Sequence, residues 1–220
     1  MWDPAALILL TLHHTRQIPQ YVFRKLLHIP AFCSAAVIAW RAGNWQVTSL
    51  TLILFAVIIY PILYCLQSWK GYSSLFVEKK FGEIKKSLLL LFLTDAALVA
   101  FCGGIFGEIY VAVTAILMWG TGDGTAALVG KRIGKHHVKI RFADPKKTWE
   151  GSFGMLVVSL AVGFASVMLQ TNLSLPACLV TAVVTVAVGT YVELISHNGN
   201  DTATVPIANM LVLLVLSHLL

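Results

Sequence analysis

Long apolar runs, each separated from the next by a short polar loop, are the feature that most limits how this chain can fold. A membrane-spanning helix needs about 20 apolar residues. Of the 220 residues, 58% are hydrophobic, more than the roughly 50% typical of soluble domains. The sequence therefore predicts an all-α polytopic transmembrane helix bundle forming a single domain over residues 1–220. The candidate spans are 26–40, 47–66, 87–106, 110–130, 151–170, 176–195 and 204–220.

The N-terminal apolar run, residues 5–12, is too short to cross a bilayer alone. One possibility is that residues 1–20 form an interfacial segment. The other is that residues 5–12 are the end of a span that starts further upstream. We therefore predict seven spans, or eight if this run belongs to one. A secretory signal peptide is not expected, because Asp3 stands where a basic region should be.

Basic residues are distributed unevenly between the loops. Every Lys and Arg except Arg41 lies in loop 13–25, 67–86 or 131–150. These loops alternate with oppositely placed ones, so they should share one face, which the positive-inside rule makes cytoplasmic. Loop 67–86 mixes aromatic residues with lysines, which favours either a helix in the headgroup layer or an ordinary connecting loop. Loop 131–150 is predicted to be a cytoplasmic basic loop.

Within span 110–130, the sequence GTGDG places one acid among glycines. An acid near the centre of a bilayer costs about 2.5–3.5 kcal/mol or more, which favours a functional role for Asp123 as a metal ligand or catalytic group. The alternative is an acid that only bridges helices. Gly122 and Gly124 permit a close backbone approach and weaken a helix, so the span is expected to be interrupted there.

A second polar motif, DPKKTWEGS, lies at the start of span 151–170. Asp144 is expected to be the N-cap and Pro145 the first helical residue. Helix amides and adjacent lysines suit a phosphate, whereas a plain basic anchor before a helix is the alternative reading. Glu150 would lie on the same helical face as Lys147 and either orient it or hold a cation. Lys146, Lys147, Thr148 and Gly151 are the expected phosphate-binding residues.

Two further polar clusters fall on the same predicted face. Arg24, Lys25 and His28 lie within FRKLLHIP. Glu193 lies near the end of span 176–195, and Asp201 lies in the loop that precedes the last span. The predicted topology thus brings basic and acidic side chains from several loops to one end of the bundle. The pair His136–His137 has no suitably spaced carboxylate and is a weak metal candidate. The four cysteines lie in apolar runs and are interpreted as packing residues.

Taken in order, the motifs RKLLH, GDGTAALVGKRIGK, KKTWEGS and VELISHNGNDTATVP resemble those of the phytol kinase / dolichol kinase family of CTP-dependent membrane lipid-alcohol kinases. The resemblance covers roughly residues 20–215, although Thr202 stands where the family usually has Asn. The KTWEG block also resembles phosphatidate cytidylyltransferases, but their later PGHGG-type signature is missing and RKLLH is not one of their features. The residues that fall on kinase-family motif positions are Arg24, Lys25, His28, Asp123, Lys147, Glu150, Glu193 and Asp201.

The resemblance implies transfer of the γ-phosphoryl group of CTP to an isoprenoid alcohol that enters from the bilayer, with Mg²⁺ as cofactor and release of CDP. Alternatives are a phosphatidate cytidylyltransferase, a CTP-dependent diacylglycerol kinase and a non-catalytic transporter or scaffold; no nucleic-acid partner is expected. The implied catalytic residues are Asp123, Lys147, Glu150 and Glu193. The residues implied to contact the nucleotide are Arg24, Lys25, His28, Gly122, Gly124, Lys146, Thr148 and Gly151. The implied metal ligands are Asp123, Glu193 and Asp201.

Overall fold

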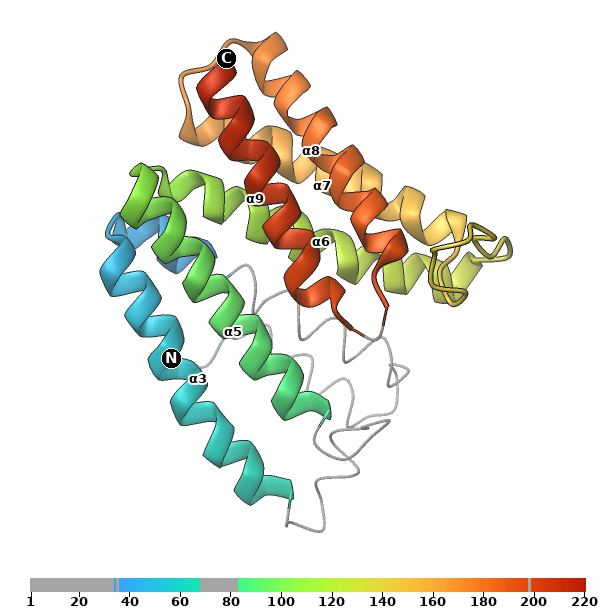
Figure 1. Cartoon of the computed structure of the whole chain (residues 1–220), viewed down its shortest axis with the longest axis horizontal. Coiled ribbons are helices and arrows are strands. Elements are labelled where there is room, and N and C mark those ends of the chain that lie inside the picture. Colours follow the sequence, from blue (N-terminus) through green and yellow to red (C-terminus); the bar gives the residue numbers. More distant parts are fainter. Residues whose placement is uncertain (1–33, 35, 68–82, 198) are drawn as a thin grey trace.

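The computed structural model describes residues 34, 36–67, 83–197 and 199–220, and long helices dominate this part of the chain (Figure 1). Residues 36–42 are helical. The longer elements are α3 (Trp45–Gln67), α5 (Glu83–Phe101), the π-helical turn η1 (Cys102–Phe106), α6 (Ile109–Ile133), α7 (Trp149–Gln170), α8 (Leu175–Ile195) and α9 (Asp201–Leu219).

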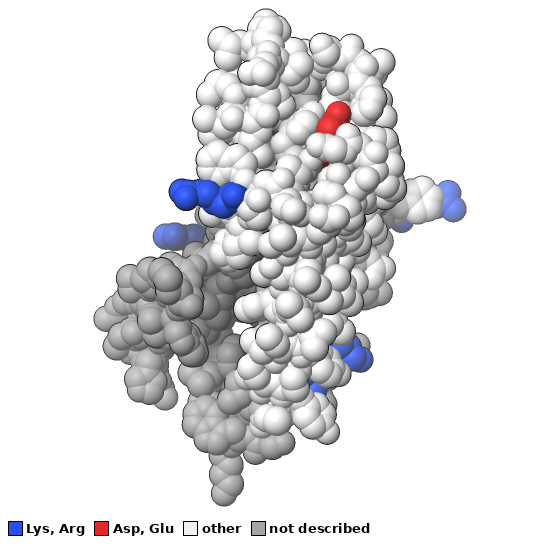
Figure 2. Space-filling model, turned by 90° about the vertical axis from the view of Figure 1, so that its left-hand side faces the viewer, with Lys and Arg blue, Asp and Glu red and all other residues white. Residues whose placement is uncertain are grey.

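Six helices of the described part are long and apolar enough to cross a membrane. They coincide, within a few residues at each end, with the predicted spans from 47–66 onward, which confirms an all-α polytopic bundle. Most of the predicted span 26–40 and all of segment 1–20 lie outside the described residues. Figure 2 shows one side of the molecule, where the described surface is largely uncharged, as lipid contact requires.

Helix α6 is the centre of the bundle. In its most apolar window 67% of the residues are buried, against 28–50% in the other five membrane-capable helices. It packs most extensively against α7 and also contacts α9, while α3 pairs with α5 and α8 pairs with α9 (Figure 1). Functional side chains on α6 are therefore surrounded by helices that bring other polar groups to them.

Contrary to the expected interruption at GTGDG, α6 runs unbroken from Ile109 to Ile133. The glycines serve close packing rather than a break. A Cβ added at Gly122 would overlap Ser159 Oγ and come within 2.9 Å of Met155 Cγ on α7. Ser159 in turn donates a 2.7 Å hydrogen bond to the carbonyl oxygen of Met118. The missing side chain thus lets α7 approach α6, and this packing offsets the low helix propensity of glycine.

Two helix starts also differ from the predictions. Helix α7 begins at Trp149, not near Pro145, and its N-cap is Thr148, whose hydroxyl accepts a hydrogen bond from the Gly151 amide at 3.2 Å. Helix α5 begins at Glu83, so Lys85 belongs to a helix and not to the predicted interfacial segment 67–86. Lys85 is buried over the rings of Tyr60 and Tyr64, and this cation–π contact explains how a lysine is accommodated there. Residues 68–82 lie outside the described residues.

Candidate functional site

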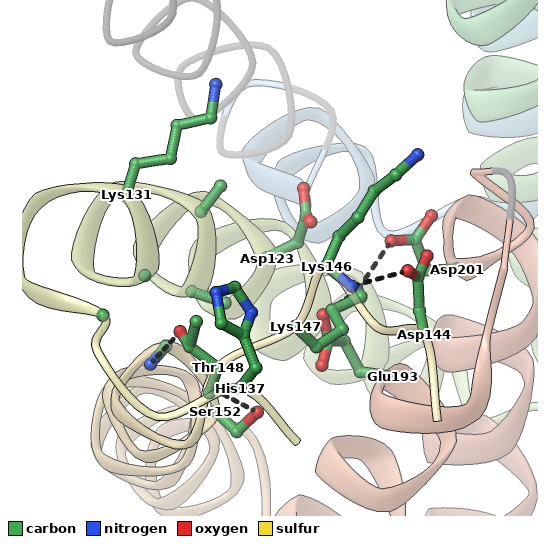
Figure 3. Close-up of a pocket in the computed structure, with 15 residues that line it drawn as sticks. Asp123, Lys131, His137, Asp144, Lys146, Lys147, Thr148, Ser152, Glu193 and Asp201 are labelled. Carbon is green, nitrogen blue, oxygen red and sulfur yellow. Dashed lines mark hydrogen bonds and ion pairs between the residues drawn. The ribbon is translucent and has the colours of Figure 1, made fainter. Parts of the chain in front are cut away.

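A cavity of about 380 Å³ opens at one end of the bundle, where α6, α7, α8 and α9 meet the loop between α6 and α7 (Figure 3). We call it the polar pocket. The polar residues and glycines that line it come from a stretch of almost eighty positions in the sequence. These residues are Asp123, Gly130, Lys131, Gly134, His137, Asp144, Lys146, Lys147, Thr148, Gly151, Ser152, Glu193 and Asp201.

Lys147 is the centre of the charge arrangement in the polar pocket. Its ammonium group donates to the Glu193 carboxylate and lies 3.4 Å from Asp201 Oδ2. The Glu193 side chain is only 2% exposed, and the Lys147 side chain is 20% exposed. Burial opposes the lysine charge, but the carboxylates of Glu193, Asp201 and Asp123 outweigh it and raise the pKa of Lys147 above its ordinary value. The surrounding carboxylates therefore favour the charged form of Lys147 in the pocket.

The loop that presents Lys147 is held on both sides by backbone hydrogen bonds. His137 and Thr148 form an isolated antiparallel bridge, the Val138 amide donates to the Lys147 carbonyl at 3.0 Å, and the Trp149 amide donates to the His136 carbonyl at 3.0 Å. A further bond from the Asp144 amide to the carbonyl of Leu194, also 3.0 Å, joins the loop to the end of α8. The backbone, and not side-chain contacts alone, thus fixes the position of Lys147 beside Glu193.

Glycines bring the start of α7 close to the end of α6. A Cβ added at Gly151 would lie 2.8 Å from the carbonyl oxygen of Ala126 and 3.1 Å from Thr148 Oγ1. The amides of Trp149 and Gly151 already donate to His136 and Thr148. Because these first-turn amides are engaged, a phosphate in the pocket would depend on the lysines and on the positive end of the α7 dipole rather than on free amides.

Glu150 does not lie beside Lys147 as expected. Since α7 begins two residues after Lys147, the two side chains do not share a helical face. The Glu150 carboxylate instead contacts His136 Nδ1 at 2.7 Å and accepts hydrogen bonds from the amides of Lys135 and His136. It therefore holds the first residues of the loop, and Glu193 and Asp201 take the place beside the lysine.

Of the residues predicted for the site, the structure gathers seven around the polar pocket: Asp123, Lys146, Lys147, Thr148, Gly151, Glu193 and Asp201. Gly122 and Gly124 are buried and do not line it. Arg24, Lys25 and His28 lie outside the described residues. Three further lining residues were not predicted as site residues: Lys131, His137, which was only a weak metal candidate, and Asp144, which was expected to be a helix cap. Lys131 could have been predicted from the sequence, because positions 123, 127 and 131 are spaced four residues apart and therefore lie on one face of a helix.

The carboxylates of the pocket suit a hard divalent cation. Glu193 and Asp201 both point at the Lys147 ammonium, and the second Glu193 oxygen, Oε2, is buried without a hydrogen-bond partner among the described residues. Within the described ranges no three acidic, histidine or cysteine side chains are close enough to form a ready-made metal centre. Magnesium commonly needs only one or two protein carboxylates, because water and substrate phosphates complete its shell. The donor set therefore fits Mg²⁺ held jointly with a polyphosphate.

Comparison with known proteins supports the same interpretation. A model of the cytidylyltransferase family matches residues 5–200. The phytol kinase of Synechocystis sp. (strain ATCC 27184 / PCC 6803 / Kazusa) is 31% identical over 205 residues, which is 88% of this chain and 78% of that protein. No solved structure matches the chain.

The helices and the pocket together define a polytopic membrane enzyme whose charged site lies at one end of its bundle. The chain belongs to the cytidylyltransferase family, and its similarity to phytol kinase confirms the kinase family predicted from the motifs. The predicted enzyme class, a phosphotransferase, is confirmed by the same relative.

Proposed function

We propose that this protein is a CTP-dependent lipid-alcohol kinase that phosphorylates an isoprenoid alcohol. The observation that carries the proposal is the partly buried arrangement of Lys147 between Glu193 and Asp201 in a pocket at the end of a membrane bundle. Phosphoryl transfer requires charge neutralisation and in-line positioning more than covalent help from the protein. Similarity to a phytol kinase and to cytidylyltransferases supports the lipid alcohol as acceptor and the cytidine nucleotide as donor.

In this proposal the lysines hold the triphosphate. Three nearby carboxylates raise the pKa of Lys147 and so favour its charged form. Lys146 is exposed beside it and can reach a phosphate from the open side of the pocket. Substrate phosphate oxygens would share Lys147 with Glu193 and Asp201. Because the first-turn amides of α7 are engaged, both lysines should contribute strongly to nucleotide affinity.

The carboxylates have two tasks in the proposed reaction. Glu193 and Asp201, with Asp123, would hold Mg²⁺, which neutralises the phosphate charge when bound. We assign Asp123 as the group that accepts the alcohol proton, since it lines the pocket from the central helix α6 and is half-buried. The alcohol oxygen then forms a bond to the γ-phosphorus, the bond between that phosphorus and the β–γ bridging oxygen breaks, and CDP leaves.

The lipid alcohol is expected to keep its chain in the bilayer while its hydroxyl enters the pocket at headgroup level. Charge asymmetry of the loops supports a cytoplasmic location for this pocket, where CTP is available. Single cysteines at His136 and Asn44, in a background without the native cysteines, would report this topology. Labelling of both positions from the same side of sealed vesicles would contradict it.

A second candidate is phosphatidate cytidylyltransferase activity, which the description of the matching family favours. The two activities differ in the fate of the phosphates. With CTP labelled at the γ-phosphate and a prenol as acceptor, kinase activity moves the label to an organic-soluble lipid phosphate. With α-labelled CTP the label stays in water-soluble CDP. Transfer of α-label into the lipid phase with phosphatidate as acceptor would replace the kinase assignment, and removal of Mg²⁺ should stop either reaction.

A further inference from the structure

The loop between α6 and α7 carries an exposed tip, residues 139–142, in which basic and apolar side chains alternate. In order these residues are Lys139, Ile140, Arg141 and Phe142, and all four are exposed. Ile140 is 45% exposed and Phe142 is 66% exposed, in spite of their apolar character. The Arg141 guanidinium lies 5.5 Å from the centre of the Phe142 ring. None of these four side chains contributes to the polar pocket.

The residues on either side of the tip are buried. Val138 is 3% exposed and Ala143 is 8% exposed, and both pack with Leu194 at the end of α8. The bond from the Asp144 amide to the Leu194 carbonyl ties the tip to the same place. Because α8 is long and apolar enough to cross a membrane and ends at Ile195, the expected level of the tip is the boundary between the hydrocarbon layer and the headgroups.

Other exposed apolar residues near this level agree with that placement. Ile133 at the end of α6 is 57% exposed, and Trp149 at the start of α7 is 50% exposed. Tryptophan is enriched where the bilayer meets water. The tip therefore lies in the loop between the end of α6 and the start of α7, and both of these helix ends carry side chains suited to the bilayer surface.

We propose that the tip docks onto the bilayer surface and binds anionic phospholipid headgroups. Ile140 and Phe142 would enter the boundary between headgroups and acyl chains, and Lys139 and Arg141 would contact lipid phosphates. The tip has two positive charges, and its four residues include no acid to offset them. An exposed apolar pair flanked by cations matches the chemistry of an anionic interface, whereas a neutral surface would satisfy only the apolar part.

Docking of the tip would also affect the polar pocket, because the backbone connects the tip to residues that line the pocket. Asp144, Lys146 and Lys147 follow the tip directly and line the pocket, and the Lys147 amide donates to the Asp144 carbonyl at 2.9 Å. A docked tip would fix the segment that presents the two lysines. Anionic lipid should therefore increase nucleotide affinity, a consequence that depends on the function proposed above, while docking itself does not.

The test uses the full-length protein in nanodiscs with an environment-sensitive fluorophore on a single cysteine, introduced as Phe142→Cys in a background without the native cysteines. Nanodiscs contain either phosphatidylcholine alone or phosphatidylcholine mixed with phosphatidylglycerol. We expect blue-shifted, brighter emission in the anionic discs. Adding Lys139→Ala and Arg141→Ala should reduce the ratio of docked to undocked tip about fivefold for each charge removed. Lys135→Ala, an exposed lysine of the same loop, is the matched control.

Emission that is equally water-like in both lipid mixtures would overturn the proposal and leave a soluble protein as the partner to seek. Emission that is blue-shifted equally in both mixtures, and unchanged by the two alanine substitutions, would overturn the role of anionic headgroups. Equilibrium binding of CTP in the same discs gives the second readout. Anionic lipid should tighten it several-fold in the native protein and not in the double-alanine variant. Docking without any CTP binding would count against the proposed function alone.

Discussion

Replacing Lys147 should separate the structural role of the buried pair from its chemical role. Lys147→Met removes the cation that pairs with the Glu193 carboxylate, whose side chain is only 2% exposed in the native protein. Breaking a buried ion pair at one end destabilises a protein by about 3–5 kcal/mol, because a buried charge is left uncompensated. Lys147 retains 20% exposure, so water can reach the pair. We therefore expect a loss near the lower limit, about 3 kcal/mol.

The double variant Lys147→Met/Glu193→Gln removes both charges and should recover most of that stability, to within about 1 kcal/mol of the native protein. Turnover, however, should remain at least roughly 10²-fold lower in both variants, because the group that neutralises the phosphates is gone. Lys135→Met changes an exposed lysine of the same loop and should alter stability by no more than about 0.5 kcal/mol.

The measurements are thermal unfolding in one detergent, the yield of folded protein, and turnover with CTP and a prenol. Glu193→Gln alone completes the comparison. If the losses of stability in Lys147→Met and in Glu193→Gln add up to the loss in the double variant, the two charges do not interact and the Lys147–Glu193 pair is not formed. If the stable double variant turns over at a normal rate, Lys147 belongs to the architecture and has no part in the reaction.

Three further perturbations follow from the site. Asp123→Asn should lower turnover at least roughly 10²-fold while membrane insertion and elution volume stay normal; near-normal turnover would refute its assignment. Thr148→Ala should lower the unfolding free energy by about 0.5–2 kcal/mol, because α7 loses its cap, and Thr148→Ser should restore it. Since the pKa of Lys147 is raised, its charge and its stabilising contribution are complete below its ordinary pKa and are lost only as pH rises through the raised value. A pH–rate profile should therefore have no limb between neutral pH and about pH 9 that disappears in Lys147→Met; such a limb would place the pKa of Lys147 below its ordinary value and contradict the raised pKa.

The apolar length of each segment was sufficient to locate six of the helices, because crossing a bilayer requires a length that few other structures need. The motif GTGDG was harder to interpret. Its glycines weaken an isolated helix, but Gly122 faces Ser159 and Met155 of α7, and a single sequence does not show that contact. Local propensity therefore predicted a break where packing between helices keeps α6 continuous.

The start of α7 shows a similar limit. Asp144 and Thr148 are both good capping residues, and the sequence alone favoured the earlier one because Pro145 follows it. In the structure Asp144 Oδ1 accepts from the amide of Lys146 and forms a turn, while Thr148 caps the helix. The backbone bridge between His137 and Thr148 prevents the helix from extending further back. This shift of four residues also explains why Glu150 was assigned to the wrong neighbour.

The glycine contacts between α6 and α7 also restrict how a lipid reaches the pocket. Gly122, Gly151 and Gly163 meet the facing helix so closely that even one added carbon would overlap or crowd it. An isoprenoid chain is far wider than a methyl group and cannot pass between these two helices without separating them. The contact between α6 and α7 thus leaves no path for a lipid chain. A membrane-borne acceptor must approach the polar pocket from another side of α6.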